Sequence, residues 1–265
     1  MRNVRLQIAY DGSRFFGWQR QDGFLSVQEA LEDAVLAATN QVVVVNGAGR
    51  TDAGVHALGM VAHTHVDTAL TDDRLRHAIN AHVAEGVCVR RIETCRDDFH
   101  ARFDAVSKRY LYVVATTRFE PVFGKLQQHW TCHPLDLGAM RAAGRLLVGT
   151  HDFKAFGNTG SPRKTTVRTI HSLHFLVRRS RVGFVVQANG FLYNMVRTIA
   201  GTLLDVGRGK RDPECVARAF VNLKRHEVGS TAPARGLYFL SAQYAEPVLR
   251  GIDTAGEGRP GAFQA

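Results

Sequence analysis

The chain has 265 residues, of which 45% are hydrophobic and 22% charged, a composition that excludes wholesale disorder and suits one large domain or two of ordinary size. No stretch approaches the roughly 18 apolar residues that a membrane span needs, and the N-terminus lacks the apolar segment of a signal peptide. Lysine and arginine number 34 against 24 acidic residues, so the formal charge of +10 predicts a polyanionic partner, nucleic acid before a membrane.

In the first half of the chain, alternating apolar residues predict a strand over 4–10, and a turn rich in glycine and aromatic residues follows over 11–19. Ser26 stands three residues before Glu29, the spacing of a capping box, and an apolar stripe behind it predicts a helix. The β-branched run Val42–Val45 is too short for a helix and predicts a buried strand. The remaining expected elements are a strand over 59–66, a helix over 75–82 and a strand over 87–94.

The second half mixes strands and helices in the same way. The expected strands cover residues 108–116, 166–178, 182–187 and 237–244. The expected helices cover residues 137–147, 193–205 and a segment that begins with Asp212 as N-cap and Pro213 as first helical residue. Because the regular alternation of a dinucleotide-binding fold is missing, we predict the α+β class.

The domain organisation follows from this pattern. We predict two similar α+β halves, 1–105 and 106–246, that meet near residue 105. Residues 247–265 are rich in glycine and poor in apolar residues, so we predict a disordered tail there.

The densest unusual segment is Gly47–Ala57, directly after the strand predicted at 42–45. Its glycines permit backbone conformations and close approaches that side chains would block. Arg50 and Asp52 stand two residues apart, so they project to the same side of an extended backbone. A surface turn with a local ion pair would have the same composition, and these residues alone leave both interpretations open.

Two further positions carry candidate chemistry. Arg197 stands among apolar residues at the start of a predicted helix, where a buried guanidinium needs a carboxylate or phosphate partner. A place on the solvated edge of that helix is the alternative. Tyr110 follows Lys108 and Arg109 on a predicted strand, where a tyrosine is most often part of the core or of the sheet surface.

Other clusters point away from cofactor or metal chemistry. The alternating His63 and His65 have no third ligand at metal spacing, and no Cys-x-x-Cys pair exists. No segment matches a phosphate-binding loop or a serine nucleophile elbow. The four cysteines are scattered and favour a reducing cytoplasm. We therefore expect a cytoplasmic protein without cofactor or metal.

Several segments together resemble the tRNA pseudouridine synthase A family. Gly49–Ala57 is similar to the signature of that family. The other similar segments are Tyr10–Gln21, Ser26–Gln28, Phe99–Phe103, Arg109–Tyr112, Gly149–Phe153, Phe191–Arg197 and Thr231–Leu237. They follow the family's order from about residue 3 to 245, and no catalytic position departs from the family pattern.

The resemblance implies a fold and an activity. The implied fold is two ferredoxin-like (RRM-like) halves that form a mixed, mainly antiparallel sheet around a central basic cleft. The implied enzyme is a homodimer that isomerises uridine to pseudouridine at positions 38, 39 and 40 of the tRNA anticodon stem-loop, without a cofactor. The C1′–N1 bond breaks, the uracil turns, and C5 replaces N1 at the sugar.

The resemblance also assigns roles. Asp52 matches the catalytic carboxylate, Arg197 its partner, and Tyr110 the aromatic residue that stacks on the uracil. A base inside a stem must be extruded, at a cost of about a few kcal/mol, and Arg50 is the candidate to fill the gap. We predict a direct contact between Arg197 and Asp52, because burying either charge alone is costly. Addition of Asp52 to the base or sugar, and removal of a 2′ proton through a glycal, both remain open.

Two other classes of function are weighed against this one. A nucleoside or glycoside hydrolase would want two carboxylates at the scissile bond and would release free uracil. An RNA-binding module would explain the charge but has no use for Asp52 inside a basic surface. The residues that we expect to contact phosphates are Arg14, Arg20, Arg50, Arg163, Lys164, Arg168 and the turn Arg178–Arg181.

Overall fold

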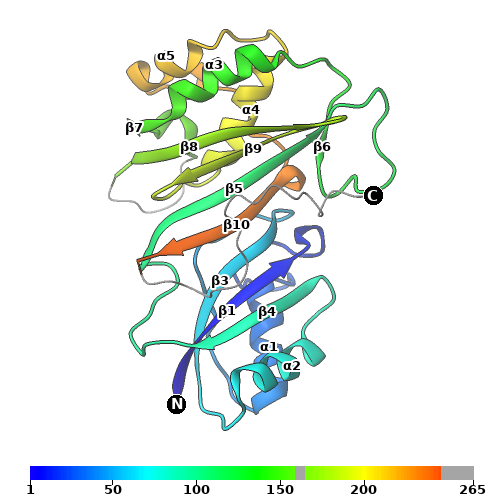
Figure 1. Ribbon diagram of the computed structural model, residues 1–265, viewed down its shortest axis with the longest axis vertical. Coiled ribbons are helices and arrows are strands. Elements are labelled where there is room, and N and C mark those ends of the chain that lie inside the picture. The colour runs from blue at the N-terminus through cyan, green and yellow to red at the C-terminus, as the bar shows by residue number, and fades with distance from the viewer. Residues whose placement is uncertain (159–164, 246–265) are drawn as a thin grey trace.

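The computed structural model describes residues 1–158 and 165–245 (Figure 1). The strands are β1 (Arg2–Tyr10), β2 (Asn46–Gly47), β3 (His56–Val66), β4 (Val87–Thr94), β5 (Ala105–Ala115), β6 (His129–Trp130), β7 (Gly149–Asp152), β8 (Val167–Arg178), β9 (Arg181–Ala188) and β10 (Leu237–Tyr244). The helices are α1 (Val27–Thr39), α2 (Asp72–His82), α3 (Leu137–Leu147), α4 (Met195–Gly207) and α5 (Cys215–Asn222). The predicted tail, 247–265, lies outside the described residues.

One sheet runs through the molecule in the order β4-β1-β3-β10-β5-β9-β8-β7, with β2 paired to β3 and β6 to β5. Among the described pairings, β10 with β3 and β5 with β6 are parallel and the others antiparallel. The predicted α+β class with a mixed, mainly antiparallel sheet is therefore confirmed. The division of the chain at residue 105 stays a prediction.

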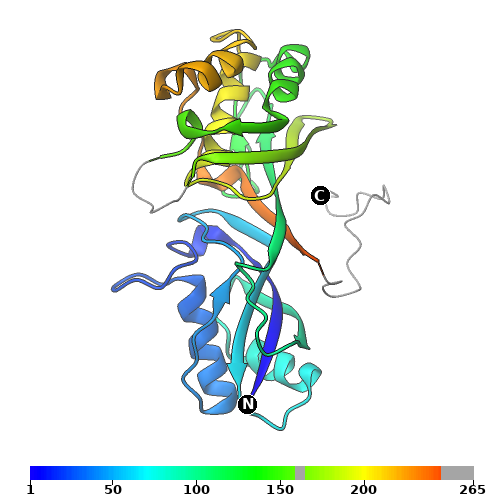
Figure 2. The ribbon, with the colours of Figure 1, turned by 90° about the vertical axis from the view of Figure 1, so that its left-hand side faces the viewer.

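The helices gather at the two ends of this sheet (Figure 1). Helices α1 and α2 lie at the end that holds β1, β3 and β4, and α3, α4 and α5 lie at the end that holds β7, β8 and β9. Strand β10 joins the two ends, because it pairs with β3 through Tyr238 and Phe239 and with β5 along its whole length. Figure 2 shows β10 crossing the junction.

Local sequence signals account for several boundaries. The hydroxyl of Ser26 accepts a hydrogen bond from the Glu29 N–H at 3.1 Å, so α1 begins at the predicted cap. The helix ends at Asn40, whose φ of 56° is left-handed. The bounds of β4, α3 and β10 agree with the sequence prediction.

The strand predicted at Val42–Val45 is wrong. The segment forms no strand; Val42 is 89% and Val44 62% exposed, and only Val45 is buried. The Val45 N–H donates to the Glu32 carboxylate at 3.1 Å instead of to a neighbouring strand. A β-branched run forms a strand only where its side chains have a sheet to pack on. The strand pairing at the start of the glycine-rich loop is formed instead by β2, which pairs antiparallel with β3.

The start predicted for the last helix is also wrong. Helix α5 begins at Cys215, and its N-cap is Glu214. The Cys215 N–H donates to the Asp212 carbonyl at 3.2 Å and the Val216 N–H to the Pro213 carbonyl at 3.3 Å. These bonds span three residues instead of four, so the first turn is a tight turn and α-helical geometry starts later.

Candidate active site

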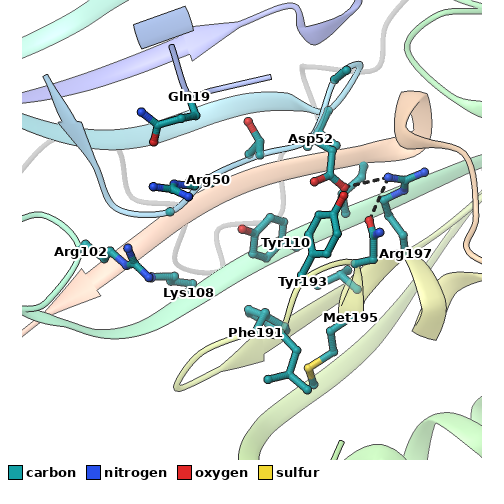
Figure 3. Close-up of a pocket in the computed structure, with 18 of the residues that line it drawn as sticks. Gln19, Arg50, Asp52, Arg102, Lys108, Tyr110, Phe191, Tyr193, Met195 and Arg197 are labelled. Carbon is teal, nitrogen blue, oxygen red and sulfur yellow. Dashed lines mark hydrogen bonds and ion pairs between the residues drawn. The ribbon is translucent and has the colours of Figure 1, made fainter. Parts of the chain in front are cut away.

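A cavity of about 550 Å³ opens near the middle of the sheet, between the loop that precedes β3 and the start of α4 (Figure 3). The glycine-rich loop, β5 and the start of α4 line it. Its walls include all four residues singled out from the sequence, which are Arg50, Asp52, Tyr110 and Arg197. The volume lies in the usual range for small-molecule and cofactor sites.

The turn over 11–19 fixes the backbone next to Asp52. The Trp18 N–H donates to the Thr51 carbonyl at 3.0 Å, and the Tyr10 hydroxyl hydrogen-bonds to the Thr51 hydroxyl at 2.8 Å. Gly17 has a φ of +91°, and a Cβ there would lie 2.6 Å from the Thr51 oxygen. Only glycine permits this approach, so the glycine of the turn serves the geometry of the loop that carries Asp52.

A buried histidine holds the other end of the loop. His56 Nδ1 accepts the Gly12 N–H at 3.1 Å and lies 3.1 Å from an Asp11 oxygen, while Nε2 lies 3.0 Å from the Leu126 carbonyl. Accepting at Nδ1 leaves Nε2 as the donor. Burial lowers the pKa of His56, against the opposing charge of Asp11. The imidazole therefore stays neutral at neutral pH and ties the loop to two distant segments.

The predicted contact between Arg197 and Asp52 is confirmed. Arg197 Nη1 donates to Asp52 Oδ2 at 2.8 Å across 145 residues of sequence (Figure 3). The side chains are 19% and 26% exposed, respectively, so the pair is only partly open to water. Arg197 also donates from Nε to the Ala232 carbonyl at 2.8 Å and from Nη1 to Asn194 Oδ1 at 3.0 Å. The guanidinium is thus aimed by three partners.

Close packing places the Ala232 carbonyl where Arg197 can reach it. A Cβ at Gly201, on α4, would lie 1.7 Å from the Ser230 carbonyl oxygen, so the segment before β10 contacts the bare helix backbone. The Ala232 N–H donates to the Arg197 carbonyl at 3.0 Å. Backbone and side chain of Arg197 are therefore both held by Ala232.

Tyr110 forms the floor of the cavity and is 8% exposed. Its ring meets Phe191 edge-to-face at 5.0 Å and Phe239 edge-to-face at 5.1 Å between centroids. Burial, and then the charge of Asp52, raise the pKa of Tyr110 far above its usual value. The phenol therefore stays protonated at neutral and mildly alkaline pH.

Sequence reasoning missed a group of cations that also lines the cavity. Lys108 lies on β5 two residues before Tyr110, and Arg102 lies on the loop before that strand. Burial, and then the charge of Arg102, lower the pKa of the Lys108 ammonium to about 8. The signal that could have found Lys108 is the two-residue period of a strand, which puts it on the same face as Tyr110.

The residues expected to contact phosphates have varied surroundings. Arg14 pairs with Glu85 at 2.8 Å, and Arg20 pairs with Glu32 at 3.1 Å. Arg50 is exposed at the cavity. Arg168 lies on β8 and the Arg178–Arg181 turn connects β8 to β9; neither lines the cavity. Arg163 and Lys164 lie outside the described residues. Contacts of this set with phosphates stay predictions.

The described ranges, 1–158 and 165–245, contain neither a candidate metal cluster nor a helix suited to span a membrane. No group of three or more His, Cys, Asp or Glu side chains there is placed to hold a metal ion. No helix there is both long and apolar enough to cross a bilayer.

The chain matches the family model for tRNA pseudouridine synthase over residues 7–104 and 143–245. It is 39% identical over 244 residues to the tRNA pseudouridine synthase A of Acetivibrio thermocellus, an alignment that covers 92% of this chain and 100% of that protein. It is 43% identical over 245 residues to the protein of that name from Syntrophotalea carbinolica, covering 91% and 96%. Among solved structures, it is similar to the archaeal box H/ACA sRNP Nop10-Cbf5 complex, with a TM-score of 0.35 and 11% identity over 76% of this chain and 44% of that one, which is too weak a likeness to inform the fold.

Proposed function

The chain belongs to the tRNA pseudouridine synthase family, which makes it an isomerase acting on tRNA, and from this premise we propose that it modifies uridines 38, 39 and 40 of the anticodon stem-loop. The 2.8 Å contact between Arg197 and Asp52, inside a cavity that Tyr110 floors, supports this proposal most directly. This contact gives the Asp52 carboxylate a fixed direction inside a cavity of about 550 Å³, a volume in the usual range for ligand sites.

Each residue has a part in the proposed reaction. Arg50, exposed at the mouth of the cavity, takes the place of the extruded base in the stem. Asp52 acts as nucleophile or base when the C1′–N1 bond breaks, and Arg197 holds its oxygens toward the sugar. Tyr110 stacks on the uracil while it turns. A bond between C5 and C1′ then forms, C5 loses its proton, N1 gains one, and Asp52 is regenerated.

The proposal includes a homodimer in the cytoplasm, with one tRNA touching both subunits. The resemblance of the chain to its family supports this assembly, and the formal charge of +10 supports a large polyanionic substrate. Sedimentation of the protein alone and with tRNA measures the assembly: the mass of two chains is expected in both cases, and the mass of a single chain would contradict the dimer.

The activity is tested with unmodified tRNA transcripts that carry uridine at position 38, 39 or 40, mapped for pseudouridine by carbodiimide-stop sequencing. New stops at those positions are expected, and matched transcripts with cytidine there should give none. Free uracil in place of pseudouridine would indicate a hydrolase. Tight binding without any product would indicate an RNA-binding module.

A further inference from the structure

Three cations gather on the side of the cavity away from Asp52. Figure 3 shows Arg50, Arg102 and Lys108 on that side, with Tyr110 between them and the ion pair. The Lys108 ammonium lies close to the glycine-rich loop: a Cβ at Gly49 would be 3.8 Å from Lys108 Nζ and 3.9 Å from the Tyr110 hydroxyl. Lysine and tyrosine thus face the same space from one strand.

None of these three cations has an acidic partner within 4.0 Å among the described residues. The other titratable groups that line the cavity are Asp52 with its partner Arg197, Tyr193, and Tyr110, whose raised pKa keeps the phenol protonated. Burial and Arg102 bring the pKa of Lys108 down to about 8. The half-buried Lys108 ammonium offers three donors and faces the like charge of Arg102, and an anion that enters the cavity relieves this repulsion.

We propose that Lys108 and Arg102 bind the phosphodiester that flanks the extruded uridine, with Arg50 at its outer edge. The inference rests on the proposed function, because it takes the nucleotide to be the occupant of the cavity. Three converging cations fit a phosphate, whose oxygens accept several charge-assisted hydrogen bonds, better than a neutral carbonyl of the base. Lys108 and Tyr110 are two residues apart on β5, about 7 Å, a separation suited to a phosphate and the base of one nucleotide.

This subsite sets how far the extruded nucleotide enters the cavity. With the phosphate held at Lys108, the base meets Tyr110 and the sugar lies toward Asp52. A nucleotide without its flanking phosphate lacks this contact with Lys108, so its depth in the cavity is not fixed. Lys108 is therefore a binding residue whose loss raises KM more than it lowers kcat.

The test pairs a protein variant with a change to one RNA atom group. The RNA is an anticodon stem-loop in which each phosphate around the target uridine is replaced in turn by a neutral methylphosphonate. Affinity is measured for Lys108 and for Lys108→Met, both in an Asp52→Asn background that leaves the RNA unconverted. One flanking methylphosphonate should weaken binding to the Lys108 protein about tenfold and to Lys108→Met by less than about twofold.

A second arm uses pH. Binding by the Lys108 protein should weaken above about pH 8, as the ammonium loses its proton in the free protein. Lys108→Arg keeps its charge at every pH, so it should bind at pH 7 within a few-fold and lose this alkaline limb. Binding that arginine preserves without the alkaline limb, and that methionine weakens, would show that the charge at residue 108 binds the RNA. A purely structural role for Lys108 would not produce this pH dependence.

The matched control is Lys210→Met, a change of an exposed lysine just beyond α4, at the end of that helix away from the cavity. It should keep the methylphosphonate response and the alkaline limb. Equal sensitivity of Lys108 and Lys108→Met to every methylphosphonate would overturn the inference. Failure of the proposed function would show separately: the protein without substitutions would then make no pseudouridine in the unmodified stem-loop.

Discussion

The two sides of the cavity differ in whether their charged side chains are paired. On one side, Asp52 and Arg197 satisfy each other, and the guanidinium is further held by Ala232 and Asn194. On the other side, Lys108 faces other cations and has no acidic neighbour within the described part of the chain. In the proposed mechanism, the fold itself therefore preorganises the Asp52 carboxylate, whereas the anionic substrate completes the far side.

Asp52→Asn should have the largest effect, because it removes the carboxylate that we propose reacts and leaves the cations on the far side in place. We expect turnover to fall by on the order of 10³-fold or more, with tRNA affinity unchanged within a few-fold. Single-turnover pseudouridine formation and equilibrium binding measure the two effects. Asp212→Asn, at the surface pair with Arg218, is the control and should retain full activity. Residual turnover above about 1% in a clean preparation would remove Asp52 from the catalytic role.

Arg197→Met tests the aim of the carboxylate. We expect turnover to fall by about 10²-fold, because Asp52 loses the donor that fixes its direction. Arg197→Lys should fall less, since it keeps the charge, but one ammonium cannot reach Asp52 and Ala232 with the geometry of a fork. Rates for the two variants are compared with Arg218→Met. Equal losses for lysine and methionine would mean that charge plays no part in the effect.

Tyr110→Phe separates stacking from the hydroxyl. We expect binding within about twofold, because the stacking ring stays, and turnover about tenfold lower, because the variant lacks the hydroxyl that we expect to assist proton loss from C5. Since the raised pKa of Tyr110 keeps its phenol protonated, kcat should be flat from about pH 7 to 9.5, while affinity falls above about pH 8 with Lys108. An alkaline limb in kcat that Tyr110→Phe abolishes would contradict this separation.

The smallest expected effect comes from the outer cations. Arg50→Gln should reduce affinity several-fold and lower the slope of log affinity against log salt by about 0.7–0.9, the value for one phosphate. Arg14→Gln should change the slope less, because Glu85 already pairs with Arg14 at 2.8 Å. Titrations at four salt concentrations give both slopes. The same slope change in both variants would show that the internal ion pair is immaterial.

Much of the fold could be predicted from the sequence where local signals and tertiary packing agree. The alternation in β1 and the cap at Ser26 are of this kind. The strand predicted at Val42–Val45 is absent because β-branched residues form strands where their side chains pack on a sheet, and the side chains of Val42 and Val44 are exposed. The position of β10 between β3 and β5 depends on contacts across most of the chain, which no short window of sequence contains.

The candidate site divides in a similar way. The pairing of Arg197 with Asp52 could be predicted, because two isolated charges in apolar settings need each other. The period of β5 could have placed Lys108 on the same face as Tyr110, but it could not predict that Lys108 is partly buried, since a lysine on a strand is ordinarily exposed. The partial burial beside Arg102 depends on the loop before β5, which no local pattern describes.

The place of β10 has a consequence for the enzyme during its own synthesis. Every other described strand leaves the ribosome before residues 237–244 do. Until they emerge, β3 and β5 have no shared neighbour, and Ala232, which holds Arg197, has only just been made. Nascent chains that lack β10 therefore have both halves of the site but not the joint between them. We therefore expect a ribosome-bound or prematurely terminated product that lacks β10 to be inactive toward tRNA.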